Sequence, residues 1–220
     1  MKPNHHLDDA TLVSYSAGAL PEALGVVAST HLERCAHCRD RLLDADRIGG
    51  VLMQQQRVDA PLDSARAAML ALLDGEPAIE SARTPTDAVE KRDPDRLPLA
   101  LHPWFGNSMR ALQWRRVAPG VKRIRAKGVD GGNLMLLRIS PGCRLPLHSH
   151  GGNELTMILD GAYDDMLGHF GPGDVADLDG ETRHQPVTAP GVPCICVAAT
   201  DAPLQFSGWA IRMLQPMFGF

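Results

Sequence analysis

The sequence is poor in aromatic residues and has no long hydrophobic run. Phe, Trp and Tyr together account for 5% of its 220 residues. No segment approaches the roughly 20 apolar residues that a membrane-spanning helix needs. The first residues, MKPNHHLDDATL, also lack the apolar core of a signal peptide. We therefore expect a cytoplasmic protein without a membrane anchor.

The chain also lacks a strong excess of either charge. It carries 22 Lys and Arg against 26 Asp and Glu, which gives a net charge of −4. This balance provides no global attraction to nucleic acid or to an anionic membrane. One stretch, Arg110 to Lys127, carries seven basic residues and no acidic one, with Trp104 and Trp114 nearby, and aromatic residues among cations can stack on bases. Its alternating pattern is more typical of the exposed face of outer strands, so we expect no direct nucleic-acid binding.

Cysteine is scarce, with five residues, an odd number. Cys35 and Cys38 form a C-x2-C motif beside histidines, which in a reducing compartment favours metal binding or redox chemistry over a disulfide framework. Cys194 and Cys196 alternate along a predicted strand. We expect one of them to face the interior and the other to face outward, as small packing residues.

The first third of the chain has the pattern of short helices. Asp8 or Asp9 can cap the first helix, and Gly18 and Pro21 end it. The predicted helices span residues 10–19, 22–33, 39–53 and 63–73. Four short helices provide a thin core, so a structural metal would stabilise this unit.

The composition changes after this helical region. Residues 74–98 are rich in Pro and charge, which is typical of a linker. Short alternating apolar runs broken by Gly and Pro follow, including NLMLLRISPG, ELTMILDGAY, GDVADLDG, CICVAAT and FSGWAIRML. Such runs indicate an antiparallel barrel or sandwich. We therefore predict a multidomain α + β protein with a helical domain at 1–75, a linker at 76–103 and a β domain at 104–220.

A first set of metal-ligand residues lies in the helical domain. On a helix, His31 and Cys35 are four residues apart and share a face, and Cys38 follows one turn later. Three such ligands leave one position of a tetrahedral zinc site to be filled from elsewhere. His6 is the obvious fourth ligand, and His5 is an alternative.

A second set lies in the β domain. His148 and His150 are two residues apart, so on a strand their side chains point to one face. Glu154 returns to the same face after the Gly151–Gly152 turn, and His184 would come from a neighbouring strand. Imidazole and carboxylate ligands suit zinc, iron, manganese, nickel or copper.

These motifs carry two family resemblances. The H-x3-C-x2-C run with an upstream histidine resembles the zinc-binding anti-sigma domain, and this match covers residues 1–75. The run G-x5-H-x-H-x3-E-x6-G, from Gly142 to Gly161, resembles the first cupin signature at every named position. The second cupin signature is kept only in part, because Asp179, Glu181 and Thr188 replace its proline, glycine and asparagine.

Together the two domains resemble the ChrR-type family of zinc anti-sigma factors. The resemblance implies a jelly-roll cupin fold and zinc in both domains. It also implies a roughly one-to-one complex in which residues 1–75 inhibit a group IV (extracytoplasmic-function) sigma factor. The cupin domain would sense an oxidative signal such as singlet oxygen, and a Cys35–Cys38 disulfide would provide one release switch. Dimerisation through the cupin is a further option.

Two other interpretations stay open at this point. Many cupins with a site of three histidines and one glutamate are metal-dependent dioxygenases or isomerases, and the helical domain would then be regulatory. Apart from the ligands, however, the sequence offers no general acid or base, so we name no catalytic residue. A DNA-binding regulator is less favoured, because residues 1–75 are acidic on balance.

Overall fold

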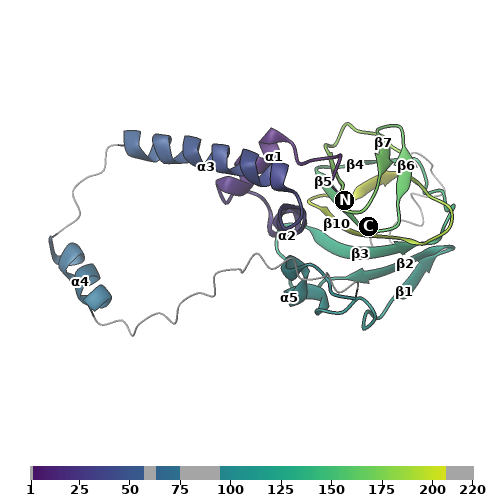
Figure 1. The fold of residues 1–220 in the computed structure, drawn as a ribbon, viewed down its shortest axis with the longest axis horizontal. Coiled ribbons are helices and arrows are strands. Elements are labelled where there is room, and N and C mark those ends of the chain that lie inside the picture. Colours follow the sequence, from purple (N-terminus) through teal and green to yellow (C-terminus); the bar gives the residue numbers. More distant parts are fainter. Residues whose placement is uncertain (1, 57–62, 75–94, 207–220) are drawn as a thin grey trace.

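The structure, a computed structural model, describes residues 2–56, 63–74 and 95–206 (Figure 1). Its helices are α1 (Asp9–Ser16), α2 (Glu22–Leu32), α3 (Ala36–Gln55), α4 (Asp63–Asp74), the short 3-10 helix η1 (Leu99–Leu101) and α5 (His102–Phe105). The four helices predicted in the first third of the chain are all present. In the described part of the chain, no helix combines the length and apolar character needed to cross a membrane.

Local sequence signals explain where these helices begin and end. The Asp8 carboxylate accepts a hydrogen bond from the Thr11 backbone N–H and so caps α1. After α1 the backbone turns at Gly18, whose φ of 65° favours glycine. Cys35 occupies the N-cap of α3, and its Sγ lies 3.4 Å from the Cys38 backbone nitrogen. A predicted metal ligand therefore also defines a helix boundary.

The β domain is a sandwich of antiparallel strands. They are β1 (Arg115–Ala118), β2 (Val121–Arg125), β3 (Asn133–Ile139), β4 (His148–His150), β5 (Glu154–Asp160), β6 (Tyr163–Asp165), β7 (Gly168–Phe170), β8 (Val175–Leu178), β9 (Val187–Thr188), β10 (Cys194–Thr200) and β11 (Leu204–Phe206). The large sheet has the order β1-β2-β3-β10-β5-β8, and smaller sheets pair β11 with β4 and β7 with β6 and β9. This arrangement is the cupin-type sandwich expected from the sequence.

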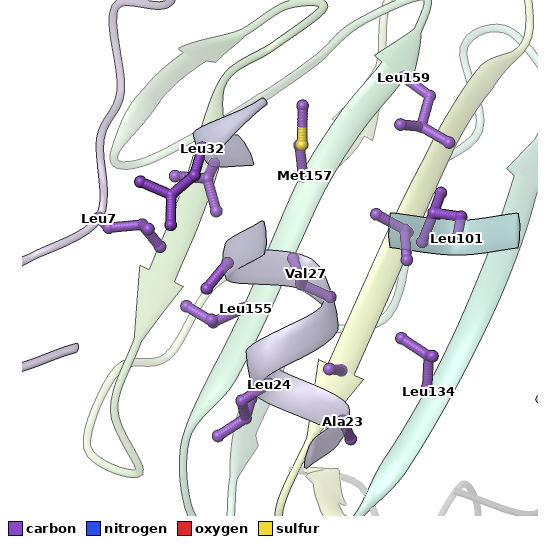
Figure 2. Packing of buried hydrophobic residues seen from close by; sticks show 14 of the residues in the cluster. Leu7, Ala23, Leu24, Val27, Leu32, Leu101, Leu134, Leu155, Met157 and Leu159 are labelled. Carbon is purple, nitrogen blue, oxygen red and sulfur yellow. The ribbon is translucent and has the colours of Figure 1, made fainter. Parts of the chain in front are cut away.

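Helix α2 covers the outer face of the large sheet, where it packs on β3, β5 and β10 (Figure 2). Ala23, Leu24 and Val27 of the helix are buried in one hydrophobic cluster with Leu155 and Met157 of the sheet. Burying a Leu or Val side chain stabilises a fold by about 1.5–3 kcal/mol. The helical region and the β domain are therefore joined by a shared core.

The inner face of the same sheet forms a second cluster, and here one prediction is wrong. Cys194 and Cys196 are both buried in this cluster, together with Ile158 and Tyr163. Residues two apart on a strand point to the same face, so the expectation that one cysteine would face outward misapplied the strand period. Both thiols face the sandwich interior.

The predicted linker at 76–103 is too long at its C-terminal end. Residues 95–103 include η1 and the start of α5, and Leu97 and Leu101 are buried in the cluster that contains α2. Glu33 accepts hydrogen bonds from the backbone N–H groups of Leu99 and Ala100. In the sequence these leucines lie among Pro and charged residues, so the composition did not indicate that they are buried. Residues 75–94, and most of the predicted strand FSGWAIRML, lie outside the described residues.

Helices α3 and α4 expose large apolar side chains. Only Cys38 is buried on α3, although the helix has 20 residues. The exposed apolar residues of the two helices are Leu43, Ile48, Val51, Leu52, Met53, Met69, Leu70, Leu72 and Leu73. We call this set the apolar helix surface.

Candidate metal centres

The N-terminal candidate ligands converge in space. One ligand atom from each of His6, His31, Cys35 and Cys38 lies within 4.8 Å of all the others. His31 Nε2 is 3.2 Å from Cys38 Sγ, and His6 Nδ1 is 3.2 Å from Cys35 Sγ. Two thiols and two imidazoles at these separations match the donor set of a closed structural zinc site.

Three different elements position these ligands. His31 lies in the last turn of α2, Cys35 caps α3 and Cys38 lies in the first turn of α3. His6 comes from the N-terminal arm, residues 3–7, which precedes α1. His5 is not part of the cluster, because its ring stacks on Phe170 with centroids 4.0 Å apart. Of the two histidines that the sequence left open, the geometry selects His6.

Burial sets the protonation of this cluster in the metal-free chain. It lowers the pKa of His31 to about 4, although the hydrogen bond with Gly173 acts in the opposite direction. Burial also raises the pKa of the Cys38 thiol to about 11. Near neutral pH His31 is therefore neutral and ready to bind a metal, whereas Cys38 must lose a proton when a metal binds.

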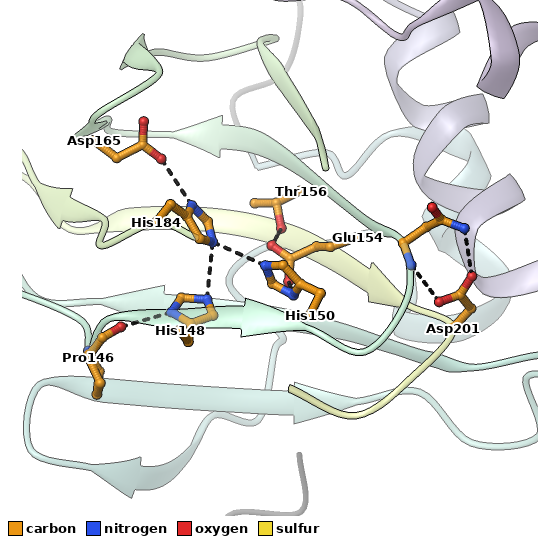
Figure 3. A network of polar contacts seen from close by, with 9 residues as sticks. Pro146, His148, His150, Glu154, Thr156, Asp165, His184 and Asp201 are labelled. Atoms are coloured by element: carbon orange, nitrogen blue, oxygen red, sulfur yellow. Dashed lines mark hydrogen bonds and ion pairs between the residues drawn. The ribbon is translucent and has the colours of Figure 1, made fainter. Parts of the chain in front are cut away.

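The second candidate site lies between β4 and the loop that follows β8 (Figure 3). His148, His150 and His184 are buried, and one ring nitrogen from each lies within 4.8 Å of the others. The backbones of His148 and His184 exchange two hydrogen bonds, of 3.1 and 3.0 Å. This bridge brings two parts of the chain that are 36 residues apart into one site.

Glu154 lies beside these histidines but outside the group of converging ligand atoms. Its Oε1 accepts a hydrogen bond of 2.9 Å from the Thr156 hydroxyl, and its Oε2 is 3.0 Å from His150 Nδ1. Burial raises the pKa of this carboxyl, but the neighbouring imidazoles outweigh that effect and hold the pKa at about 2. The structure therefore places an ionised carboxylate next to the three imidazoles.

Two neighbours that the sequence analysis missed orient the imidazoles. His184 Nδ1 lies 3.0 Å from Oδ2 of Asp165, whose side chain is buried. His148 Nδ1 donates to the Pro146 carbonyl at 2.8 Å. Partners of this kind fix the tautomer of a ligand histidine and its ring orientation. Asp165 follows no spacing rule relative to His184, so only the folded chain reveals the pair.

The arrangement of ring nitrogens fits a cation. A carbonyl and a carboxylate both accept hydrogen bonds, so the outer Nδ1 atoms of His148 and His184 carry the protons and their Nε2 atoms carry lone pairs. Those two Nε2 atoms face each other at 3.1 Å. His150 Nδ1 is buried, and Oε2 of Glu154 lies 3.0 Å from it. A metal ion would relieve the repulsion between the facing lone pairs.

Comparison with known proteins agrees with the description of both the helical region and the β domain. Residues 106–203 match the family model described as the ChrR cupin-like domain. Over 218 residues the chain is 37% identical to the anti-sigma-E factor ChrR of Cereibacter sphaeroides, and the match covers 99% of each chain.

A solved structure is similar over nearly the same length. It is the crystal structure of Rhodobacter sphaeroides SigE in complex with the anti-sigma ChrR, and the similarity has a TM-score of 0.73 and 34% identity. The match covers 91% of this chain and 99% of that one. Identity at this level, over both the helical region and the cupin-like domain, shows that this chain belongs to the ChrR family of anti-sigma factors.

Proposed function

We propose that this protein binds a group IV (extracytoplasmic-function) sigma factor in a roughly one-to-one complex and inhibits it. The observation that carries the proposal is the 37% identity to an anti-sigma-E factor across 99% of both chains. The similar solved chain is described in complex with SigE, which supports a partner of the same class. The proposal assigns a regulatory role to the chain rather than a catalytic one.

The apolar helix surface supports this partner. Large exposed apolar patches on a protein commonly mark interaction sites. Ile48 and Leu52 lie one turn apart on α3 and are 62% and 57% exposed. A partner that packs against α3 and α4 would remove these side chains from water. We propose that this surface contacts the sigma factor.

Both candidate metal centres are proposed to hold zinc, one ion in each domain. The mixed thiol and imidazole set of His6, His31, Cys35 and Cys38 favours zinc and closed coordination. At the second site His148, His150 and His184 supply imidazoles with Glu154 beside them, a set that several metals accept. Zinc at that site rests on family membership. Bound at the first site, the ion would hold the N-terminal arm, the end of α2 and the start of α3 together.

We propose a division of labour between the two domains. Residues 1–75 would hold the sigma factor, and the cupin-like domain at 104–220 would sense an oxidative signal, such as singlet oxygen, in the cytoplasm. The buried imidazoles and thiols of the two centres support this role, because such side chains are targets of oxidants. The signal would then be read at His148, His150, Glu154 and His184.

The test is co-expression of the full chain with candidate group IV sigma factors, followed by pull-down, metal analysis and transcription assays. A stable complex near one to one, loss of transcription and about two zinc ions per chain would support the proposal. In the double variant His148→Gln/His150→Gln, inhibition should persist while release by singlet oxygen is lost. If no sigma factor binds, and the protein instead contains iron and consumes oxygen with small substrates, the cupin dioxygenase interpretation becomes the better one.

A further inference from the structure

The N-terminal arm is bound to a turn of the cupin-like domain. The turn comprises residues 171–174, between β7 and β8. Asp174, which is only 3% exposed, accepts hydrogen bonds through Oδ1 from the backbone N–H groups of Asn4 and His5. Its Oδ2 accepts a further bond of 2.8 Å from the Gly171 N–H. One buried carboxylate therefore holds both the turn and the arm, immediately before His6.

The same turn contacts a metal ligand directly. His31 Nδ1 donates a hydrogen bond of 3.0 Å to the Gly173 carbonyl, across 142 residues of sequence. Because a carbonyl only accepts, this bond places the proton on Nδ1 and leaves the Nε2 lone pair directed toward Cys38 Sγ at 3.2 Å. Gly173 has a φ of 98°, and an added Cβ would lie 3.3 Å from Pro3 of the arm. The fit between turn and arm is close.

A second contact holds the arm from the side. The His5 ring stacks on Phe170, and His5 Nε2 lies 3.1 Å from the His169 carbonyl oxygen. A Cβ added at Gly168 would lie 3.4 Å from the His5 ring. His5 is therefore an anchor for His6 rather than an alternative ligand.

From these contacts we infer that the Gly173–Asp174 turn of the cupin-like domain is an integral part of the N-terminal metal site. Gly173 orients His31, and Asp174 and His5 hold the backbone that presents His6. Asp174 and His5 are thus positioning residues, which act on the metal through the ligands. The inference rests on the proposed zinc at this site, and it makes retention of that zinc depend on the other domain.

The second site lies at the other end of the strand that follows this turn. The turn leads directly into β8, the four-residue strand Val175–Leu178. At the far end of β8, Leu178 pairs with Glu154, and the chain then reaches His184 within six residues. One short strand therefore links the Gly173–Asp174 turn to the edge of the second site.

The experiment measures zinc release from the N-terminal site in full-length protein. His148→Gln/His150→Gln is the background, so that zinc is held by the N-terminal site alone, and transfer to a coloured chelator is followed over time. Substitution of a partner that orients a ligand commonly costs 10- to 100-fold in metal affinity. We expect Asp174→Asn to release zinc on the order of 10-fold faster. Asp160→Asn, at the exposed end of β5, should leave the rate unchanged.

His5→Ala provides a second test that leaves the sandwich itself unaltered. It should also speed release, because the arm loses its stacking and hydrogen bond while every ligand remains. As a control for general loss of structure, metal release from the second site is measured for Asp174→Asn in a Cys35→Ser/Cys38→Ser background. That rate should match the rate of the background protein alone.

The outcomes separate this inference from the proposed function. If the background protein with intact cysteines contains no zinc, the proposed N-terminal zinc site is wrong. If it holds zinc but Asp174→Asn and His5→Ala both release it at the background rate, only the role of the turn is overturned. Equal acceleration at both metal sites would also overturn that role, because it would indicate a general loosening of the fold.

Discussion

His184 and Asp165 form a buried pair in which the ring Nδ1 lies 3.0 Å from a carboxylate oxygen. The pair holds the imidazole so that Nε2 faces the two other histidines. Asp165 lies on β6, and its neighbour Asp164 is an exposed carboxylate that pairs instead with His169. Adjacent residues of the same type therefore have different roles, and this difference can be tested.

Asp165→Asn should weaken metal binding at the second site by on the order of 10- to 100-fold, because it removes the negative charge beside His184 and replaces one carboxylate oxygen with an NH2 group that only donates. Competition between the protein and a metal chelator would measure the change. Asp164→Asn is the matched control and should bind the metal as the unsubstituted protein does. Equal affinities for the two variants would contradict a role for Asp165 at this site.

The metal-free protein should lose stability as the pH falls from about 6.5 to 4. The pKa of His31 is about 4 in the folded chain against an ordinary value of 6.5, so the unfolded chain binds the extra proton first. Stability therefore rises with pH through this window, and the full effect of a shift of this size is roughly 3 kcal/mol. Urea unfolding with a chelator present, at several pH values, would measure it.

The His31→Gln variant is the control for this pH effect. It should show a smaller change in the free energy of unfolding between pH 6.5 and 4, and it should not remove the change entirely. Burial also lowers the pKa of His148, so this residue contributes in the same direction. An unchanged pH profile in the variant would show that His31 is not the group responsible.

Zinc affinity at the N-terminal site should increase with pH. Burial holds the pKa of the Cys38 thiol at about 11 in the metal-free chain, so the thiol is protonated near neutral pH. Zinc binds the thiolate, and each proton that it displaces adds about a tenfold change in apparent affinity per pH unit. Chelator competition between pH 6.5 and 8.5 would measure the slope. A flat profile would mean that no thiol loses a proton on binding.

The apolar helix surface should be required for partner binding and not for folding. Ile48→Glu and Leu52→Glu place a charge on side chains that are already exposed, so the free energy of unfolding should change by no more than about 0.5 kcal/mol. Binding to the sigma factor should fall by at least tenfold if either residue is buried in the complex. Gln54→Glu adds the same charge at an exposed polar position on α3 and serves as the control.

The contact between α2 and the sheet should be important for the stability of the whole protein. Leu24→Ala removes a fully buried side chain and should cost about 2–5 kcal/mol. Because α2 packs against β5 and Leu24 belongs to the shared cluster, the unfolding transitions of the helices and of the sandwich should both shift. Val13→Ala, at an exposed position on α1, is the control and should have little effect. A shift of the helical transition alone would argue against a shared core.

The sequence located the candidate ligands more readily than the residues that orient them. His148 and His150 are related by the period of a strand, so local spacing places them on one face. The prediction that His31 and Cys35 share a face of one helix is wrong, because His31 lies at the end of α2 and Cys35 is the N-cap of α3 with an extended backbone. Gly173 meets His31 across 142 residues, and no local pattern encodes such a contact. Glu154 shows a further limit of prediction from sequence. The strand period predicts which face of the sheet its side chain is on, but not that its carboxylate contacts Thr156 and His150.

The ends of the helices were also predictable only where a local sequence signal marks them. Local signals such as the cap at Asp8 placed the ends of α1 within a few residues. The linker prediction failed at residues 95–103, because Leu97 and Leu101 are buried through contacts with α2 that composition does not reveal. The error at Cys194 and Cys196 was different in kind, since the strand period itself gives the correct answer.

The packing of α2 on the sheet has a consequence for recombination. A chimera that joins residues 1–75 to an unrelated cupin would place Leu24 and Val27 against a foreign surface. It would also lack the turn that receives the arm. Exchange of the sensory half between relatives would therefore succeed only when the outer face of β5 and β10 and the Gly173–Asp174 turn are transferred with it. Helix α2 and the sheet that it covers would therefore have to be exchanged as one unit.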